Sequence, residues 1–294
     1  MNSDKESIKS VSEFIDQVKD KRKKLKQSKS EISATWFRGE SSVYERPLVP
    51  KAYRKDGGLW DFEDIKESVY KNAKAVENNL IGTFSRYSMT YFNKNNIENN
   101  EWNNYFLMQH YGLRTRLLDW TESALIALYF SVSSRNGKND AVVWILSPHN
   151  LNEYHTKLFL SKGSLIVYFP QSIEKKSLFD QEKLNYDELM RRYLKRDFKD
   201  DVDEPSNKYY PLAIYPYLLD DRMAAQKSCF TIFGNEVNGL MESKGQENFL
   251  DRVQIDRLSK KNIKDELEWL GITEQTIYPD LSGTCKWIED KYTL

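Results

Sequence analysis

Residues 109–132 have the sequence QHYGLRTRLLDWTESALIALYFSV, which divides into two unlike halves. The first half, from Gln109 to Thr121, holds an amide, an imidazole, two guanidinium groups and a carboxylate. The second half, from Ala124 to Val132, is almost wholly apolar and is typical of a buried helix. Polar groups beside such a helix are usually hydrogen-bonded or used in chemistry. The stretch therefore predicts a functional site where a central helix begins.

The rest of the chain mixes helices and strands without a regular βαβ rhythm. Strands are predicted at residues 34–40, 141–146, 210–217, 229–233 and 252–257, and helices at 7–28, 60–86, 101–111, 120–134, 171–197, 221–226, 261–270 and 279–292. This order favours an α+β fold, with a small mixed β-sheet packed by several helices around one buried central helix. We expect residues 1–30 to form an amphipathic helix with a basic end, and residues 31–294 to form a single α+β domain.

Composition narrows the class of protein. A chain of 294 residues with 39% hydrophobic content can bury a sizeable core. Lys plus Arg and Asp plus Glu number 44 each, which argues against a surface built wholly for nucleic acid but leaves a local basic patch open. The chain starts without an apolar leader and has no run of about 18 apolar residues. We therefore expect a soluble cytoplasmic protein that does not bind a membrane.

The sequence offers no metal-binding motif. Cys229 and Cys285 stand outside any CxxC pair, and we expect both to be reduced and mostly buried. The acidic run at residues 200–204 lacks the glycine turn and distal glutamate of a calcium loop, so we interpret it as a solvated loop. No metal is predicted. Motifs for ATP, dinucleotide, zinc-protease and α/β-hydrolase chemistry are also missing.

Arg38 is the first candidate site residue. It lies near the end of the predicted strand at 34–40, beside Gly39. A glycine lets the backbone approach a ligand, and a guanidinium group can hold a phosphate through two parallel hydrogen bonds. The alternative is a structural ion pair with Asp119. The residues alone leave both interpretations open.

His110 is the histidine with the strongest functional setting, because it lies in the polar block just before a glycine. Its side chain can exchange a proton near neutral pH, which suits a general acid or base. The alternative is a purely structural hydrogen bond. His149 and His155 are expected on the surface.

Asp119 allows two roles that can hold together. It stands three residues before Glu122, a spacing that predicts an N-cap for the helix at 120–134. Its carboxylate could also orient Arg38, Arg116 or His110, or activate a water or a substrate hydroxyl.

Further candidates could line a nucleotide-sized pocket. Arg222 and Gln226 are four residues apart and share one helical face, so they could meet Arg38 and Gln109. The alternative is a polar network that supports Phe230 in the core.

Arg116 is a candidate for reading a phosphate. It alternates with Arg114 around Thr115, so in an extended segment the two arginines share one face. We expect one of them to bind phosphate and the other to be exposed.

Three elements in order resemble the FRG domain family, which is named for a (Phe/Tyr)-Arg-Gly motif. They are Phe37-Arg38-Gly39, the block from Gln109 to Thr121, and the segment from Arg222 to Phe230. With the run from Gly271 to Leu281, the resemblance extends over about residues 33–285. Members are common in bacteria and phages, often beside mobile elements and defence genes. The resemblance therefore implies a bacterial or phage protein with a defence or toxin role.

The pair Arg38-Gly39 is also similar to the strand-borne Arg-Gly that holds the NAD phosphate in ADP-ribosyltransferase toxins. Those enzymes need a late glutamate as well, commonly in a Glu-x-Glu pair. After residue 200 the chain has only Glu266-Leu267-Glu268, and that pair falls in a predicted helix. The position of this pair argues against a close match to those toxins.

Two functions follow as hypotheses. The first is an ADP-ribosyltransferase-like or NAD-cleaving enzyme, with NAD as its substrate. Its catalytic residues would be Arg38, His110 and Asp119, and its binding residues Gln109, Arg116, Arg222 and Gln226. The second is a non-catalytic sensor or binding module for a phosphate-bearing small molecule or a phage protein. An antitoxin partner and nucleic acid stay open as further partners.

Overall fold

The computed structural model describes residues 7–25, 34–55, 58–59, 66–134, 138–157, 167, 193–194 and 209–293. Its helices are α1 (Val11–Leu25), α2 (Lys66–Lys94), α3 (Glu101–His110), α4 (Ala124–Val132), α5 (Pro148–Thr156), α7 (Asp221–Ala225), α8 (Lys260–Trp269), α9 (Glu274–Ile277) and α10 (Leu281–Tyr292). Its strands are β1 (Trp36–Glu40), β2 (Arg54–Lys55), β3 (Gly58–Leu59), β4 (Leu117–Thr121), β5 (Ala141–Leu146), β6 (Leu212–Ile214), β7 (Ser228–Ile232) and β8 (Leu250–Ile255). The α+β class is as predicted. The predicted helix at 171–197, apart from residues 193–194, and the acidic loop at 200–204 lie outside the described residues.

The main sheet has the strand order β6-β7-β4-β1-β5-β8. Neighbouring strands within it pair antiparallel, so the sheet is antiparallel where a mixed one was predicted. The β1–β5 ladder runs without a break from Trp36–Leu146 to Glu40–Val142. The β1–β4 ladder, by contrast, consists of the single pair Phe37–Thr121. The two central strands therefore part on either side of that pair.

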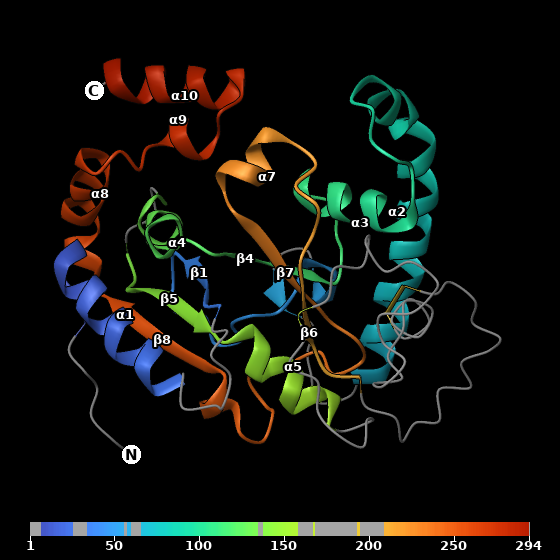
Figure 1. Ribbon diagram of the computed structural model, residues 1–294, viewed down its shortest axis with the longest axis horizontal. Coiled ribbons are helices and arrows are strands. Elements are labelled where there is room, and N and C mark those ends of the chain that lie inside the picture. The colour runs from blue at the N-terminus through green and yellow to red at the C-terminus, as the bar shows by residue number, and fades with distance from the viewer. Residues whose placement is uncertain are drawn as a thin grey trace.

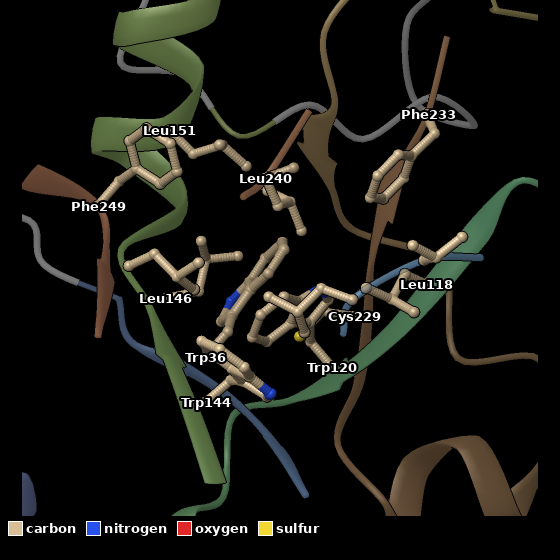
Figure 2. Close-up of a cluster of buried hydrophobic side chains, with 14 of the residues drawn as sticks. Trp36, Leu118, Trp120, Trp144, Leu146, Leu151, Cys229, Phe233, Leu240 and Phe249 are labelled. Carbon is tan, nitrogen blue, oxygen red and sulfur yellow. The ribbon is translucent and has the colours of Figure 1, made fainter. Parts of the chain in front are cut away.

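A cluster of three tryptophans packs on one face of the sheet. Trp36, Trp120 and Trp144 are all buried there, and Leu151 of α5 covers them (Figure 2). Such large apolar side chains contribute most of the burial that holds a core together. Cys229 belongs to the same cluster, as predicted, whereas Cys285 is exposed on α10 and the prediction for it was wrong.

Helices cover the opposite face of the sheet. Helix α4 packs on the central strand β1 and against α8, α1 packs on β8, and α2 and α3 lie at the β6–β7 end (Figure 1). Gly39 sets how closely α4 approaches β1, because a Cβ at this position would lie 1.9 Å from the carbonyl oxygen of Ala127. The glycine of the Phe37-Arg38-Gly39 tripeptide is thus required by packing.

Helix α1 joins the same core as the rest of the chain. Ile8, just before it, donates its backbone N–H to the carbonyl of Gln254 at 2.9 Å. The Ser10 hydroxyl accepts from the backbone N–H of Glu13 at 3.2 Å at the start of α1, which begins later than the predicted residue 7. Phe14 is buried on the inner stripe of the helix, whereas its neighbour Ile15 is 39% exposed.

Helices α3 and α8 are each followed by a glycine with a positive φ. Gly112 after α3 has a φ of +81° and Gly271 after α8 has a φ of +80°, a conformation that glycine adopts without strain. Beyond the first, Leu113 donates its N–H to the carbonyl of Met108 at 2.9 Å. This turn reverses the chain and leads from α3 into β4.

The start of α4 corrects the sequence prediction. Ser123, not Asp119, caps the helix, and its hydroxyl accepts from the backbone N–H of Ile126 at 3.4 Å. Asp119 lies within β4, opposite Phe230 of β7. Its carboxylate is therefore not used by the helix.

Candidate functional site

A pocket of about 410 Å³ lies where β1 and β4 part. Its walls come from both strands, the end of α3, α7, β7 and the residue after α9. It brings together six of the predicted site residues, namely Arg38, Gln109, His110, Asp119, Arg222 and Gln226. Small-molecule sites in proteins commonly have volumes of about 300–1,000 Å³. We call this cavity the central pocket.

Arg38 is held in place and still lines the central pocket. Its Nε lies 3.2 Å from Oε1 of Glu40, and a terminal nitrogen donates to the backbone carbonyl of Asp119 at 2.9 Å. The same nitrogen is 3.9 Å from the Asp119 carboxylate. The bond to the Asp119 carbonyl replaces a strand–strand hydrogen bond at the place where the ladder is open. The predicted ion pair with Asp119 is present, and the side chain remains 18% exposed.

Asp119 presents a carboxylate to the pocket. Its side chain is 57% exposed, and its Oδ2 accepts a hydrogen bond from Nε2 of Gln109 at 2.8 Å. The Gln109 carbonyl in turn accepts from the hydroxyl of Thr115, so the orientation of the amide is fixed. Gln109 therefore positions the Asp119 carboxylate.

Glu40 is the other carboxylate that lines the pocket. It is buried, and its second oxygen accepts from the indole N–H of Trp144 at 3.0 Å while the first faces Arg38. Because only 5% of Glu40 is exposed, this carboxylate orients Arg38 rather than contacting a ligand. Of the two lining carboxylates, Asp119 is the one that a ligand can reach.

His110 pairs with a residue that the sequence did not indicate. Its Nε2 lies 3.0 Å from Oδ2 of Asp220, and the other Asp220 oxygen accepts from the N–H of Met223 at the start of α7. Burial acts to raise the pKa of Asp220, but the hydrogen bonds from His110 and Met223 and the nearby positive charges outweigh it and lower that pKa. His110 is therefore oriented by Asp220 and not by Asp119.

Arg222 lies over an aromatic ring at the pocket wall. Its guanidinium carbon is 4.4 Å from the ring centre of Tyr278, a cation–π contact. Burial raises the pKa of the Tyr278 hydroxyl. The Nε of Arg222 is buried and has no hydrogen-bond partner within the described part of the chain. Such an atom favours a ligand that supplies an acceptor.

Gln226 connects α7 to its surroundings. Its backbone carbonyl accepts from the hydroxyl of Thr121 at 2.7 Å, and its side-chain amide is 3.4 Å from the carbonyl of Ile277. The position lines the pocket, but these bonds also hold α7 against β4 and α9. Gln226 is thus consistent with both interpretations from the sequence, a residue that lines the pocket and a member of a structural polar network.

Arg54 is a second residue that sequence reasoning missed. Its Nε donates to the carbonyl of Val49 at 2.8 Å, which brings the side chain to the pocket. Burial lowers its pKa, and the charge of Arg38 lowers it further, against the opposing effect of Glu40 and Asp119. The cluster of like charges around the pocket would be stabilised by an anion.

Arg116 does not line the central pocket, which corrects the prediction that it binds a ligand. Its side chain is 1% exposed, and its Nε donates to Oε2 of Glu77 on α2 at 2.8 Å. A terminal nitrogen also donates to the carbonyl of Phe233 at 3.1 Å. Arg116 is a structural residue of the core.

The predicted surface position of His155 was also wrong. This ring is buried, with Nδ1 2.6 Å from the carbonyl of Pro211 and Nε2 2.9 Å from the hydroxyl of Ser243. Burial lowers its pKa to about 4. It lies apart from the central pocket and is held for structural reasons.

Comparison with known families identifies the segment that builds most of this site. Residues 33–140 match the family model of the FRG domain. The chain contains an FRG domain. The matched segment carries Phe37-Arg38-Gly39 and the Gln109–Thr121 block, whereas Arg222, Gln226 and Tyr278 lie beyond it. No curated protein and no solved structure matches the chain.

The FRG domain and the segments after it therefore form one pocket between them. In the part of the chain that the structure describes, no three His, Cys, Asp or Glu side chains are grouped so that they could hold a metal ion. The helices of that part include none that is long and apolar enough to cross a membrane. The pocket's own groups are guanidinium, carboxylate, imidazole and amide side chains beside aromatic rings.

Proposed function

We propose that the central pocket binds a nucleotide. The specific activity that we propose for it is NAD-dependent ADP-ribosyl transfer or NAD cleavage. One observation carries this proposal: Arg38, Arg222 and an exposed Asp119 carboxylate line the same cavity. Guanidinium groups bind phosphate, and Tyr278 beside Arg222 offers an aromatic surface for a base. A nucleotide contains both chemical parts.

In this mechanism Arg38, fixed by Glu40, binds a phosphate of NAD. The C–N bond between ribose and nicotinamide breaks, and nicotinamide leaves with the bonding electrons. Asp119 stabilises the positive charge that develops at the anomeric carbon. The oxygen of water, or of an acceptor hydroxyl, then bonds to that carbon and releases its proton. Gln109 keeps the carboxylate in position, and His110 orients the ribose or the nicotinamide.

Asp119 takes this role because the late glutamate pair is elsewhere. Glu266 and Glu268 lie in α8, as predicted, and Glu266 accepts a hydrogen bond from the backbone N–H of Val11 at 2.7 Å. Neither glutamate lines the central pocket. The proposed chemistry therefore depends on a carboxylate of the FRG domain itself.

The biological role that we propose for this activity rests on what the resemblance to the FRG family implies. A bacterial or phage defence or toxin protein of the cytoplasm would act on the NAD pool or modify a macromolecule. Such a protein needs a partner that restrains or triggers it, either an antitoxin or a phage protein.

The test uses NAD labelled in the nicotinamide ring and, separately, in the adenylate. Purified protein is incubated with each label in buffer, in cell lysate, and with added RNA or DNA. We expect nicotinamide release, and Asp119→Asn should lower the rate about 100-fold while NAD still binds. Asp265→Asn on the exposed face of α8 is the matched control and should behave as wild type. No release and no label transfer under any condition would refute the activity.

A second candidate is a non-catalytic sensor with the same pocket. It is favoured by the pairing of His110 with Asp220, because the contacts of the Asp119 carboxylate in the described part of the chain are with Gln109 and Arg38 instead. In a sensor, Asp119→Asn and His110→Ala should weaken ligand binding in step with the cellular phenotype. In an enzyme, the same variants should lose turnover while still binding.

A further inference from the structure

A second cavity of about 450 Å³ adjoins the central pocket. The two cavities share Arg38, Arg54, Gln109 and Asp119 in their walls. The Arg38–Asp119 contact therefore lies at the boundary between them. A ligand longer than one pocket would cross that contact.

The two cavities differ in chemistry. The walls of the central pocket include Phe37, Phe130 and Tyr278, whereas the adjoining pocket has no aromatic side chain among its lining residues. The adjoining pocket adds Lys51 and Arg114 to the two shared arginines, and Asp119 is its acidic lining residue. Four cationic groups against one carboxylate suit an anion that carries more than one charge.

The backbone holds these cations in position. The ammonium of Lys51 donates to the carbonyl of Gly112, at the turn after α3, at 2.5 Å. A terminal nitrogen of Arg114 donates to the carbonyl of Arg54 at 2.8 Å, and Ala52 donates its N–H to the carbonyl of Thr115 at 3.1 Å. An ammonium has three donors and a guanidinium five, so each of these bonds uses only part of the donor capacity.

We propose that the adjoining pocket is a phosphate subsite, which makes the ligand a molecule with two or more phosphates rather than a nucleoside or a monophosphate. This inference rests on the proposed function of the central pocket. The base and ribose occupy the central pocket, and the phosphates extend past Arg38 towards Lys51 and Arg114. The pyrophosphate of a dinucleotide and the phosphodiesters of a nucleic-acid strand offer the same oxygen chemistry to this subsite.

The experiment measures binding by calorimetry for adenosine, AMP, ADP, ADP-ribose and a short single-stranded oligonucleotide. In wild type we expect affinity to rise with phosphate number and to fall as salt is raised. Lys51→Ala should weaken ADP and ADP-ribose about tenfold and leave adenosine within about twofold. Lys261→Ala, at an exposed position on α8, is the matched control. Competition between ADP-ribose and the oligonucleotide identifies which source of phosphate the subsite accepts.

The outcomes separate the two proposals. If no ligand in the series binds, the proposed function fails and the subsite fails with it. If the ligands bind with equal affinity whatever their phosphate number, and Lys51→Ala matches wild type, the subsite is refuted while the central pocket stands. Arg114→Ala is a second variant, read only if its melting temperature equals that of wild type. If that melting temperature differs, Lys51→Glu takes its place as the second variant. Reversing the exposed charge of Lys51 should abolish any gain in affinity from the second phosphate.

Discussion

Replacing Arg116 by methionine tests whether this arginine is structural. The side chain is buried, and its Nε donates to Oε2 of Glu77 at 2.8 Å. Its terminal nitrogens donate to the carbonyls of Phe233 and Tyr193. The Arg116→Met variant keeps the length of the side chain and removes all of these donors. The Glu77 carboxylate would then be buried without its cation.

The expected cost follows from those contacts. Removing one partner of a buried ion pair destabilises a protein by about 3–5 kcal/mol, because a buried charge loses its compensation. Oε1 of Glu77 would keep two donors, the hydroxyl of Tyr105 and the backbone N–H of residue 116, which places the cost towards the lower part of that range. Glu77→Met together with Arg116→Met should recover roughly 2 kcal/mol, because the orphaned charge is removed as well.

Urea unfolding with linear extrapolation gives the free energy of unfolding of each variant. Arg86→Met, at an exposed position on α2, is the control and should stay within about 0.5 kcal/mol of wild type. A loss of less than about 1 kcal/mol for Arg116→Met would refute the structural interpretation. So would weaker nucleotide binding by a variant whose stability is unchanged.

Three further predictions concern packing, pH and thiol chemistry. Gly39→Ala should destabilise the protein by about 3 kcal/mol or more in thermal unfolding, because its Cβ would lie 1.9 Å from the Ala127 carbonyl oxygen. The control Gly82→Ala, on open helix surface, should be neutral or stabilising. Equal melting temperatures for the two variants would contradict this packing. The pKa of His155 is about 4 in the folded protein, against the ordinary value of 6.5. Between these two values the unfolded chain binds a proton that the folded protein does not. The free energy of unfolding should therefore fall by about 3 kcal/mol as the pH drops from 6.5 to 4. Urea midpoints across that window measure it, and a dependence as steep in His155→Gln would exclude His155 as the cause. A thiol reagent should label Cys285 quickly and Cys229 only on unfolding, because Cys229 is buried and burial raises its pKa; two fast thiols would contradict the fold around β7.

The sequence predicted elements best where one local pattern dominated. The strand β5 was predicted at its observed bounds, because a continuous buried segment carries a strong signal. The helix predicted at 120–134 is present as α4 over the apolar run 124–132, but residues 120–121 belong to β4. Gly112 and Gly271 are local signals for the ends of α3 and α8, because each occupies a left-handed position. Local residue chemistry decides these features.

The predictions failed where two patterns competed. Asp119 and Glu122 have the spacing of a helix cap, but the strand β4 continues through Asp119, and Glu122 accepts a hydrogen bond from the hydroxyl of Tyr215 instead. The pairing of Asp119 with Phe230 across strands outweighed the local preference. The prediction that Arg116 binds phosphate failed for a similar reason, because its burial depends on Glu77, which is 39 positions away in the sequence.

The candidate site was predicted in part. The polar block identified Gln109, His110 and Asp119, and the tripeptide identified Arg38. Arg54, Asp220 and Tyr278 were missed, because each reaches the pocket only through contacts with distant segments. No spacing rule in a single sequence predicts such meetings.

The single residue pair that joins β1 to β4 divides the sheet into two three-stranded halves, β6-β7-β4 and β1-β5-β8. Each half has its own helices and its own buried cluster on the helix-covered face. Arg38 belongs to one half and Asp119 to the other. Beside the Phe37–Thr121 pair, the Arg38 side chain joins the halves through its bond to the Asp119 carbonyl at 2.9 Å, and the tryptophan cluster joins them on the other face. Two candidate site residues therefore lie on opposite sides of the junction that has the fewest paired residues in the main sheet.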